Sequence, residues 1–266
     1  MPVSACAPSG ELAISLLGGF VLRVGTDRVA LPMHSRRVLA YLCLDKGYES
    51  DCDRGLLAER LWPDATVDRS RASLRTALWR IRQASPVLVH GAGGRVRLAD
   101  GVVVDVHDFR RSAERVLTEQ RDCARDRQRL LARTTDLLPG WDETWLLLER
   151  EQLRHLWLHA LEVEARRLAE RGRYPEAIDV MLAVVAEEPL RESAQAALIE
   201  AHLCEGNVVE ARRQFTRFAK LLWTELGIRP SPKLCGRVGA VPAPPLRSVD
   251  RQVAPGGRVL LPRMGA

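Results

Sequence analysis

The chain has 266 residues, of which 40 are basic and 34 acidic, and it carries a formal net charge of +6. This length suits about two domains of ~150 residues each, and no apolar run approaches the ~20 residues that a membrane-spanning helix needs. The positive charge favours an anionic partner, but 37 of the 40 basic residues are arginine, so only the position of an arginine can indicate a binding surface.

Residues 1–10 are predicted to form a flexible leader, and they lack the basic start and apolar core of a signal peptide. A strand pattern follows, because Leu12, Ile14 and Leu16 alternate with polar or small residues. A Gly-Gly turn separates this run from a second alternating run, and a further turn leads to a third. We therefore expect an N-terminal sheet and a protein that stays in the cytoplasm, without a membrane contact.

Three helices are predicted next, at about residues 35–46, 53–62 and 68–83. Ser35 is placed to cap the first helix and Asp53 the second, because both side chains can accept a hydrogen bond from a free backbone N–H. Proline ends the second helix, and a Ser-Pro pair follows the third. The spacing predicts three short helices in close succession.

The residues after the third helix again have the pattern of β-strands. Residues 87–89 and 95–98 flank a glycine-rich stretch, which is typical of a β-hairpin. Residues 102–106 are rich in valine and predict one further strand. Strands, three helices and then a hairpin follow the order of a winged helix-turn-helix domain, which we assign to residues 11–106.

Residues 107–235 predict an all-α region with an internal repeat. Gly172 and Gly206 are 34 residues apart, as are Ala177 and Ala211, and this is the period of tetratricopeptide repeats. Alanine suits this position because its small side chain lets paired helices approach closely. We therefore predict a helical-repeat domain.

Residues 236–266 are rich in proline, glycine and arginine without periodicity, which predicts a disordered tail. The predicted fold class is α+β. It combines an N-terminal winged helix, with its sheet and hairpin wing, and an all-α tetratricopeptide-like domain.

The third predicted helix is amphipathic. At about 100° per residue, Leu74, Leu78 and Ile81 share one apolar face. Five arginines and no acidic residue lie between residues 69 and 82. The side chains on the opposite face and its shoulder are Arg69, Arg71, Arg75, Thr76, Trp79, Arg80, Arg82 and Gln83. Because the major groove admits a helix and arginine pairs with guanine, these residues predict a DNA-reading helix.

Two arginines of the predicted hairpin extend this surface. Arg95 and Arg97 alternate with Val96 and Leu98, so both are expected on one side of the wing. Cationic side chains there suit contact with DNA phosphates or the minor groove. The alternative is that these charged residues only form a solvent-exposed surface without a ligand. Ion pairs between these arginines and acidic residues of the same protein would support that alternative.

Enzyme chemistry finds little support in the sequence, and we predict neither an enzyme nor a cofactor. The six cysteines and six histidines are dispersed, without the spacing of a zinc site. His155 and His159 share a helix face, but no glutamate follows His155 as in a metalloprotease helix. No phosphate-binding loop with its lysine occurs.

Several segments together resemble the Streptomyces antibiotic regulatory protein family, in the expected order over about residues 11–235. The segments of the first half are 16–20, 57–64, 71–80 and 103–109. The segments that resemble the bacterial transcriptional activation domain of that family are 138–141, 148–151, 189–193 and 225–231.

The resemblance implies an OmpR-type winged helix followed by a tetratricopeptide-like activation domain at residues 107–235. It also implies binding to direct repeats in double-stranded promoter DNA, with two copies side by side as a possible homodimer. Contact with the sigma or alpha subunit of RNA polymerase and control of a secondary-metabolite gene cluster are implied too, at the nucleoid. The alternative is a helical-repeat adaptor whose winged helix binds no DNA.

Overall fold

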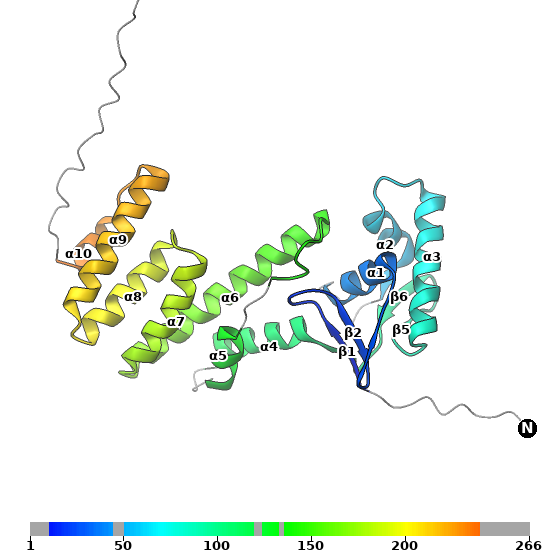
Figure 1. Cartoon of the computed structure of the whole chain (residues 1–266), viewed down its shortest axis with the longest axis horizontal. Helices are drawn as coiled ribbons and strands as arrows, with labels where there is room; N and C mark the ends of the chain where they lie inside the picture. The colour runs from blue at the N-terminus through cyan, green and yellow to red at the C-terminus, as the bar shows by residue number, and fades with distance from the viewer. Residues whose placement is uncertain (1–10, 45–50, 120–123, 133–135, 240–266) are drawn as a thin grey trace, which may run out of the picture.

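A computed structural model describes residues 11–44, 51–119, 124–132 and 136–239 of the chain. Figure 1 shows a compact N-terminal unit, in which three helices pack beside small sheets, and a curved row of helices that extends away from it. The predicted α+β class, a winged helix followed by helical repeats, is confirmed. The predicted leader and most of the predicted tail lie outside the described residues.

The N-terminal sheet has four strands in the order β3-β2-β1-β7. Their bounds are β1 Leu12–Ser15, β2 Val21–Val24, β3 Asp27–Val29 and β7 Val103–Val104. The alternation predicted for the first strands is confirmed, because Ile14 and Leu22 are almost fully buried. The last strand is shorter than the predicted 102–106, since Asp105 already begins a helix and its carboxylate accepts hydrogen bonds from Leu16 N and Leu17 N.

Three helices pack beside this sheet: α1 Met33–Leu44, α2 Arg54–Leu61 and α3 Val67–Ala84. The Asp53 cap is confirmed, because its carboxylate accepts hydrogen bonds from two backbone N–H groups of the first turn of α2. The Ser35 cap is wrong: the residue lies within α1, is 1% exposed and donates to the carbonyl of Ala77 at 3.2 Å. Ser35 therefore joins α1 to α3, and the predicted end of the first helix at about residue 46 lies outside the described residues.

The wing is a three-stranded sheet in the order β4-β6-β5. Its strands are β4 Cys52–Asp53, β5 Val89–His90 and β6 Arg95–Leu98. The predicted hairpin of β5 and β6 is confirmed, but β4 was not predicted. This extra strand joins the wing to the start of α2, where Arg54 N donates to the carbonyl of Gly94 at 3.0 Å.

The remaining helices form the repeat unit. They are α4 Asp105–Thr118, α5 Ala124–Leu131, α6 Thr144–Glu170, α7 Tyr174–Glu187, α8 Glu192–Cys204, α9 Val208–Leu226 and α10 Pro232–Arg237. The predicted 34-residue period is visible in the helix ends, since α6 and α8 end 34 residues apart and α7 and α9 begin 34 residues apart. Ala177 and Ala211 are both buried, as close helix packing requires. Helix α10 was not predicted and includes the first two residues of the predicted tail.

The two units share one continuous hydrophobic core. At their junction, Arg37 of α1 forms an ion pair with Glu143, which directly precedes α6. Leu138 N donates to the carbonyl of Leu16 at 2.9 Å, and Phe20 stacks on Trp141. The repeat unit is therefore packed against the winged helix rather than tethered to it. None of the helices in the described ranges is long and apolar enough to cross a membrane.

Candidate nucleic-acid interface

Helix α3 is held in one orientation by its apolar face. Leu74, Leu78 and Ile81 are at most 4% exposed, and Ala77 between them is 1% exposed. These residues pack against α1 and α2, while the Ser35 hydroxyl bonds to the backbone of the same helix. The rotation of α3 is thus fixed, and its opposite face must point to solvent.

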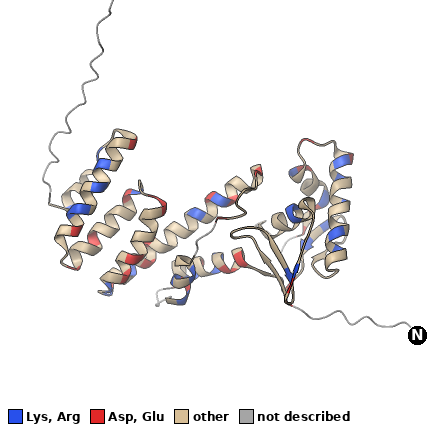
Figure 2. Cartoon of the chain, in the orientation of Figure 1, with Lys and Arg blue, Asp and Glu red and all other residues tan. Residues whose placement is uncertain are grey.

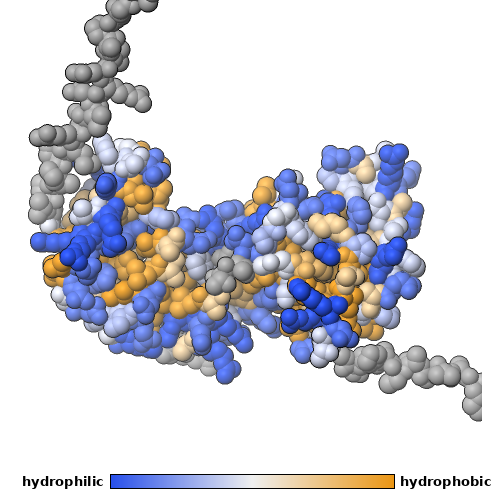
Figure 3. Space-filling view, in the orientation of Figure 1, coloured by the Kyte–Doolittle hydropathy of each residue, from blue (hydrophilic) through white to orange (hydrophobic). Residues whose placement is uncertain are grey.

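All eight of the side chains predicted to face outward from α3 are exposed. They are Arg69, Arg71, Arg75, Thr76, Trp79, Arg80, Arg82 and Gln83. None of the five arginines forms an ion pair with an acidic residue in the part of the chain that the structure describes. Figure 2 shows basic positions repeating along α3, and Figure 3 shows that this edge of the molecule is mostly hydrophilic.

Trp79 is the unusual member of this surface. Its position opposite the apolar face of α3 could place this indole either against a neighbouring element or in solvent. The structure places it on the surface, 54% exposed, with the guanidinium of Arg80 located 5.2 Å from the ring centroid. An aromatic ring and a cation thus lie side by side on the outer face of α3.

The two wing arginines differ from each other. Arg95 is exposed, as predicted. Arg97 forms hydrogen bonds with both carboxylate oxygens of Asp100, at 2.6 and 3.1 Å, and lies 3.5 Å from Asp51. The hydrogen bond with Asp100 raises the pKa of Arg97. Arg97 is therefore less available for a ligand than Arg95, because Asp51 and Asp100, distant from each other in sequence, both lie against it. Its predicted contact with DNA stays a prediction.

One basic residue of this surface was missed by the sequence analysis. Arg54, the first residue of α2, reaches toward the wing. A Cβ atom placed on Gly91 of the wing would lie 2.5 Å from Nη2 of Arg54 and 3.2 Å from Nη2 of Arg82. The Arg54 Nε atom is buried without a hydrogen-bond partner among the described residues. Two guanidinium groups therefore converge beside Gly91, and in an arginine-rich chain no local signal distinguished Arg54.

The two histidines that share a helix face, His155 and His159, are both exposed on α6. Within the described ranges, no group of three or more histidine, cysteine or acidic residues is arranged to hold a metal ion. The concentration of unpaired arginines on α3 remains the most distinctive chemical feature of the N-terminal unit.

The fold and this surface define a winged-helix protein whose third helix has a cationic outer face and which is joined to a helical-repeat module. The family model for the bacterial transcriptional activator domain matches residues 104–240, slightly more than half of the chain. The chain belongs to the family that carries this domain, and the resemblance to the Streptomyces antibiotic regulatory proteins is confirmed.

One further comparison agrees with this assignment, and another concerns the fold. The chain is 31% identical over 241 residues to the regulatory protein AfsR of Streptomyces coelicolor, and the match covers 85% of this chain but only 24% of AfsR. It also resembles the solved structure of Mycobacterium tuberculosis EmbR in complex with a low-affinity phosphopeptide. That match has a TM-score of 0.69 and 20% identity, and it covers 86% of this chain and 64% of the EmbR chain. At this identity the likeness to EmbR concerns the fold alone.

Proposed function

We propose that this protein activates transcription by binding specific double-stranded DNA through α3. The observation that carries the proposal is the outer face of this helix, where five exposed arginines lie without an acidic partner among the described residues. In a protein surface at neutral pH, arginines are often paired with acids, and an unpaired row suits the phosphates and base edges of a duplex. The apolar face of α3, buried against α1 and α2, holds these groups in register.

The side chains differ in the contacts they suit. At about 100° per residue, the exposed side chains that lie opposite the apolar face of α3 are Arg69, Thr76, Trp79, Arg80 and Gln83. We assign the four hydrogen-bonding members of this set other than Trp79 to base edges in the major groove. Arginine can donate two hydrogen bonds to guanine O6 and N7. The shoulder residues Arg71, Arg75 and Arg82 suit phosphates, which fix the position of a protein on DNA without reading its sequence.

The wing and the start of α2 extend the same surface. Arg95 is free to meet the phosphate backbone or the minor groove. Arg54 and Arg82 together offer two guanidinium groups beside Gly91, an arrangement that suits a single phosphate. Arg97 is a weaker candidate because Asp100 and Asp51 already compensate its charge.

The family places this DNA binding in gene activation. By analogy, two copies bind direct repeats near a promoter, and a surface of the chain contacts the sigma or alpha subunit of RNA polymerase. The regulated genes would belong to a secondary-metabolite cluster, and the protein would be found at the nucleoid. Because the chain spans about a quarter of AfsR, each of these roles is a proposal for this protein.

Selection from random DNA duplexes, followed by mobility-shift titration of the selected sites, tests the proposal. We expect the double variant Arg75→Glu and Arg80→Glu to bind at least about tenfold more weakly. The variant loses one base contact, worth about 1–3 kcal/mol, and it replaces one phosphate contact with a negative charge that repels the DNA backbone. The matched control is Arg23→Glu with Arg28→Glu. It makes the same charge change on exposed positions of the N-terminal sheet, on the other side of α1 (Figure 1).

The helical circular-dichroism signal should be unchanged in both variants. If the chain selects no duplex, or if the two double variants bind equally well, the winged helix does not act through α3. The protein would then be better described as a helical-repeat adaptor.

A further inference from the structure

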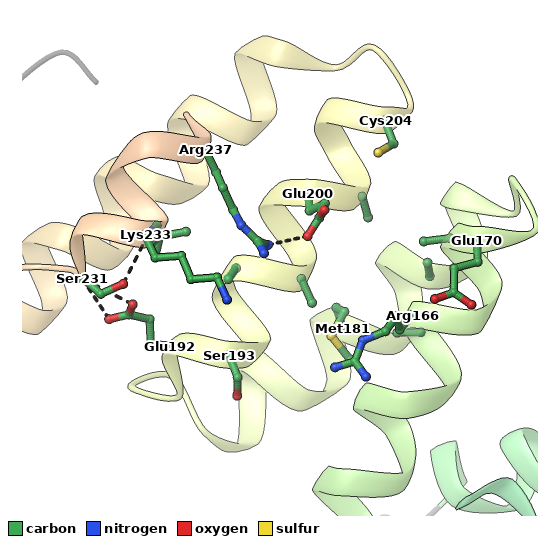
Figure 4. Close-up of a pocket in the computed structure, with 17 residues that line it drawn as sticks. Arg166, Glu170, Met181, Glu192, Ser193, Glu200, Cys204, Ser231, Lys233 and Arg237 are labelled. Carbon is green, nitrogen blue, oxygen red and sulfur yellow. Dashed lines mark hydrogen bonds and ion pairs between the residues drawn. The ribbon is translucent and has the colours of Figure 1, made fainter. Parts of the chain in front are cut away.

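Two hollows of the molecule differ in how their charged residues are balanced. One, of about 660 Å³, opens between α6, α8 and α10, and its lining holds three basic and three acidic residues (Figure 4). An ion pair joins one of these acids, Glu200, to Arg237. This lining therefore favours neither an anion nor a cation. The second hollow, beside the N-terminal sheet, is lined by charged residues of one sign only.

The second hollow has a volume of about 310 Å³ and lies where the edge strand β3 meets α1. Its lining comes from β2, from β3, from the residues next to these strands and from α1. The volume is at the lower end of the range of about 300–1,000 Å³ that is typical of ligand sites, so it suits a small molecule. The N-terminal sheet lies on the other side of α1 from α3 (Figure 1), so this hollow plays no part in the proposed DNA contact.

Most of the residues that line the second hollow are apolar. Leu22 is 1% exposed, and Val29, its partner on the neighbouring strand, is half-buried. Phe20, just before β2, is also half-buried, and its ring stacks on Trp141 at a centroid distance of 6.2 Å. Because this stacking supports the ring from one side, the hollow has a fixed aromatic wall that can pack against the apolar part of a ligand.

The charged residues of this lining are two arginines, Arg28 of β3 and Arg36 of α1. Neither forms an ion pair in the part of the chain that the structure describes. No acidic residue of the described ranges lines the hollow, and Asp27, next to Arg28 in the chain, is outside the lining. Arg23, directly opposite Arg28 on β2, adds a further positive charge nearby. A ligand that enters the hollow therefore meets positive charge only and should be an anion.

Arg36 is held in position for such an anion by a hydrogen bond of its own. Its Nε atom donates to the carbonyl oxygen of Leu31 at 2.6 Å, and the residue is half-buried. This bond fixes the guanidinium through Nε, while its two Nη groups have no hydrogen-bond partner among the described residues. A carboxylate matches these two groups, because its two oxygens can accept parallel hydrogen bonds from one guanidinium.

We infer that this second hollow binds a small organic acid with an aromatic or aliphatic body. The carboxylate of the acid pairs with Arg36 and is further attracted by Arg28. Its apolar body packs against Phe20, Leu22 and Val29, which removes apolar surface from water. Acetate supplies the charge without the apolar body, and a neutral amide of the same shape lacks the charge, so both should bind more weakly than the acid.

The test uses the full chain and a panel of small acids: benzoate, 3-phenylpropionate, cinnamate and hexanoate. Each acid is compared with its neutral amide and with acetate. Binding is followed by saturation-transfer NMR and by the melting temperature, which a ligand of the folded state raises. We expect at least one acid to bind about tenfold or more tightly than its amide, because charge-assisted hydrogen bonds are about twice as strong as neutral ones.

Two variants test whether the acid lies in the hollow. Arg28→Gln with Arg36→Gln removes both cations, and Ala30→Glu adds a carboxylate at an exposed position of the lining. Each variant should bind the acid at least about tenfold more weakly. The matched control is Ala124→Glu at the exposed first residue of α5, which should bind as the unaltered chain does. Circular dichroism checks folding, and Ala30→Glu alone decides if the arginine variant is not folded.

Photolabelling gives an independent readout of position. The photoreactive acid 4-azidobenzoate should label residues within the range 20–36, as mapped by mass spectrometry, and the neutral 4-azidobenzamide should not. The inference is overturned if no acid of the panel binds, or if the amides or acetate bind as tightly as the acids. It is also overturned if Ala30→Glu and the α5 control bind equally, or if the label maps outside residues 20–36.

Discussion

The ion pair between Arg37 and Glu143 gives a sharp prediction about how the two units are joined. The Arg37 Nη2 atom donates to Glu143 Oε2 at 2.8 Å, and Nε lies 2.7 Å from Oε1 at an angle too bent for a hydrogen bond. Arg37 also donates to the Leu61 carbonyl at the end of α2 and lies over the ring of Trp62. Replacing Glu143 with glutamine removes the charge while it keeps the shape.

The expected cost follows from the burial of the pair. The side chains of Arg37 and Glu143 are 16% and 12% exposed, so solvent screens them far less than a surface pair. Exposed pairs contribute about 0.2–1 kcal/mol, and breaking a fully buried pair costs about 3–5 kcal/mol. Glu143→Gln should lie between these limits, at about 2 kcal/mol, because Arg37 keeps its bond to the Leu61 carbonyl.

Urea unfolding of the full chain, followed by tryptophan fluorescence and circular dichroism, measures this effect. Because one hydrophobic core runs through both units, we expect both probes to report a single transition. A double-mutant cycle with Arg37→Gln should give a coupling energy of about 1–2 kcal/mol. A coupling below about 0.5 kcal/mol, or two separate transitions in the unaltered chain, would refute the conclusion that this pair joins the units.

Three further predictions concern other sites. Arg95→Gln should weaken DNA binding more than Arg97→Gln in mobility-shift titrations, because Arg97 is already paired with acids; equal losses would contradict this. Burial lowers the pKa of His107, whose Nε2 atom lies 2.6 Å from the Cys43 carbonyl. The free energy of unfolding should therefore fall as the pH drops below the unfolded histidine pKa of about 6.5, and urea titrations should show a flatter dependence for His107→Gln. Phe218→Ala should lower the free energy of unfolding in urea by about 3–5 kcal/mol, since this ring is 1% exposed in the second core cluster; a loss below about 1 kcal/mol would show that this cluster contributes little.

Features that depend on neighbouring residues could be predicted from the sequence. The apolar spacing of Leu74, Leu78 and Ile81 predicted which face of α3 is buried, and hence which residues are exposed. Asp53 was predicted as a cap because its partners lie two and three residues away. The repeat was also predictable, because Gly172 and Gly206 each belong to a short turn whose residue pattern recurs after 34 residues.

Features that depend on distant residues could not be predicted. Asp105 ends the last strand early by accepting bonds from residues 88 and 89 positions away. The Ser35 hydroxyl donates to a carbonyl 42 positions away, and the charge of Arg97 is compensated partly by Asp51 across the wing. Helix α10 is different, because the cap formed by Ser231 and the proline after it are local signals that the sequence analysis overlooked.

The most direct test of the central claim is site-specific photo-crosslinking from α3 to bound DNA. A photoreactive phenylalanine replaces Thr76, exposed on the outer face of α3, or Val209, exposed on α9 of the repeat unit. On a duplex selected by the full chain, we predict efficient crosslinks from position 76, located within the selected site, and none from position 209. A stable complex that crosslinks from position 209 but not from position 76 would show that DNA is held by another surface.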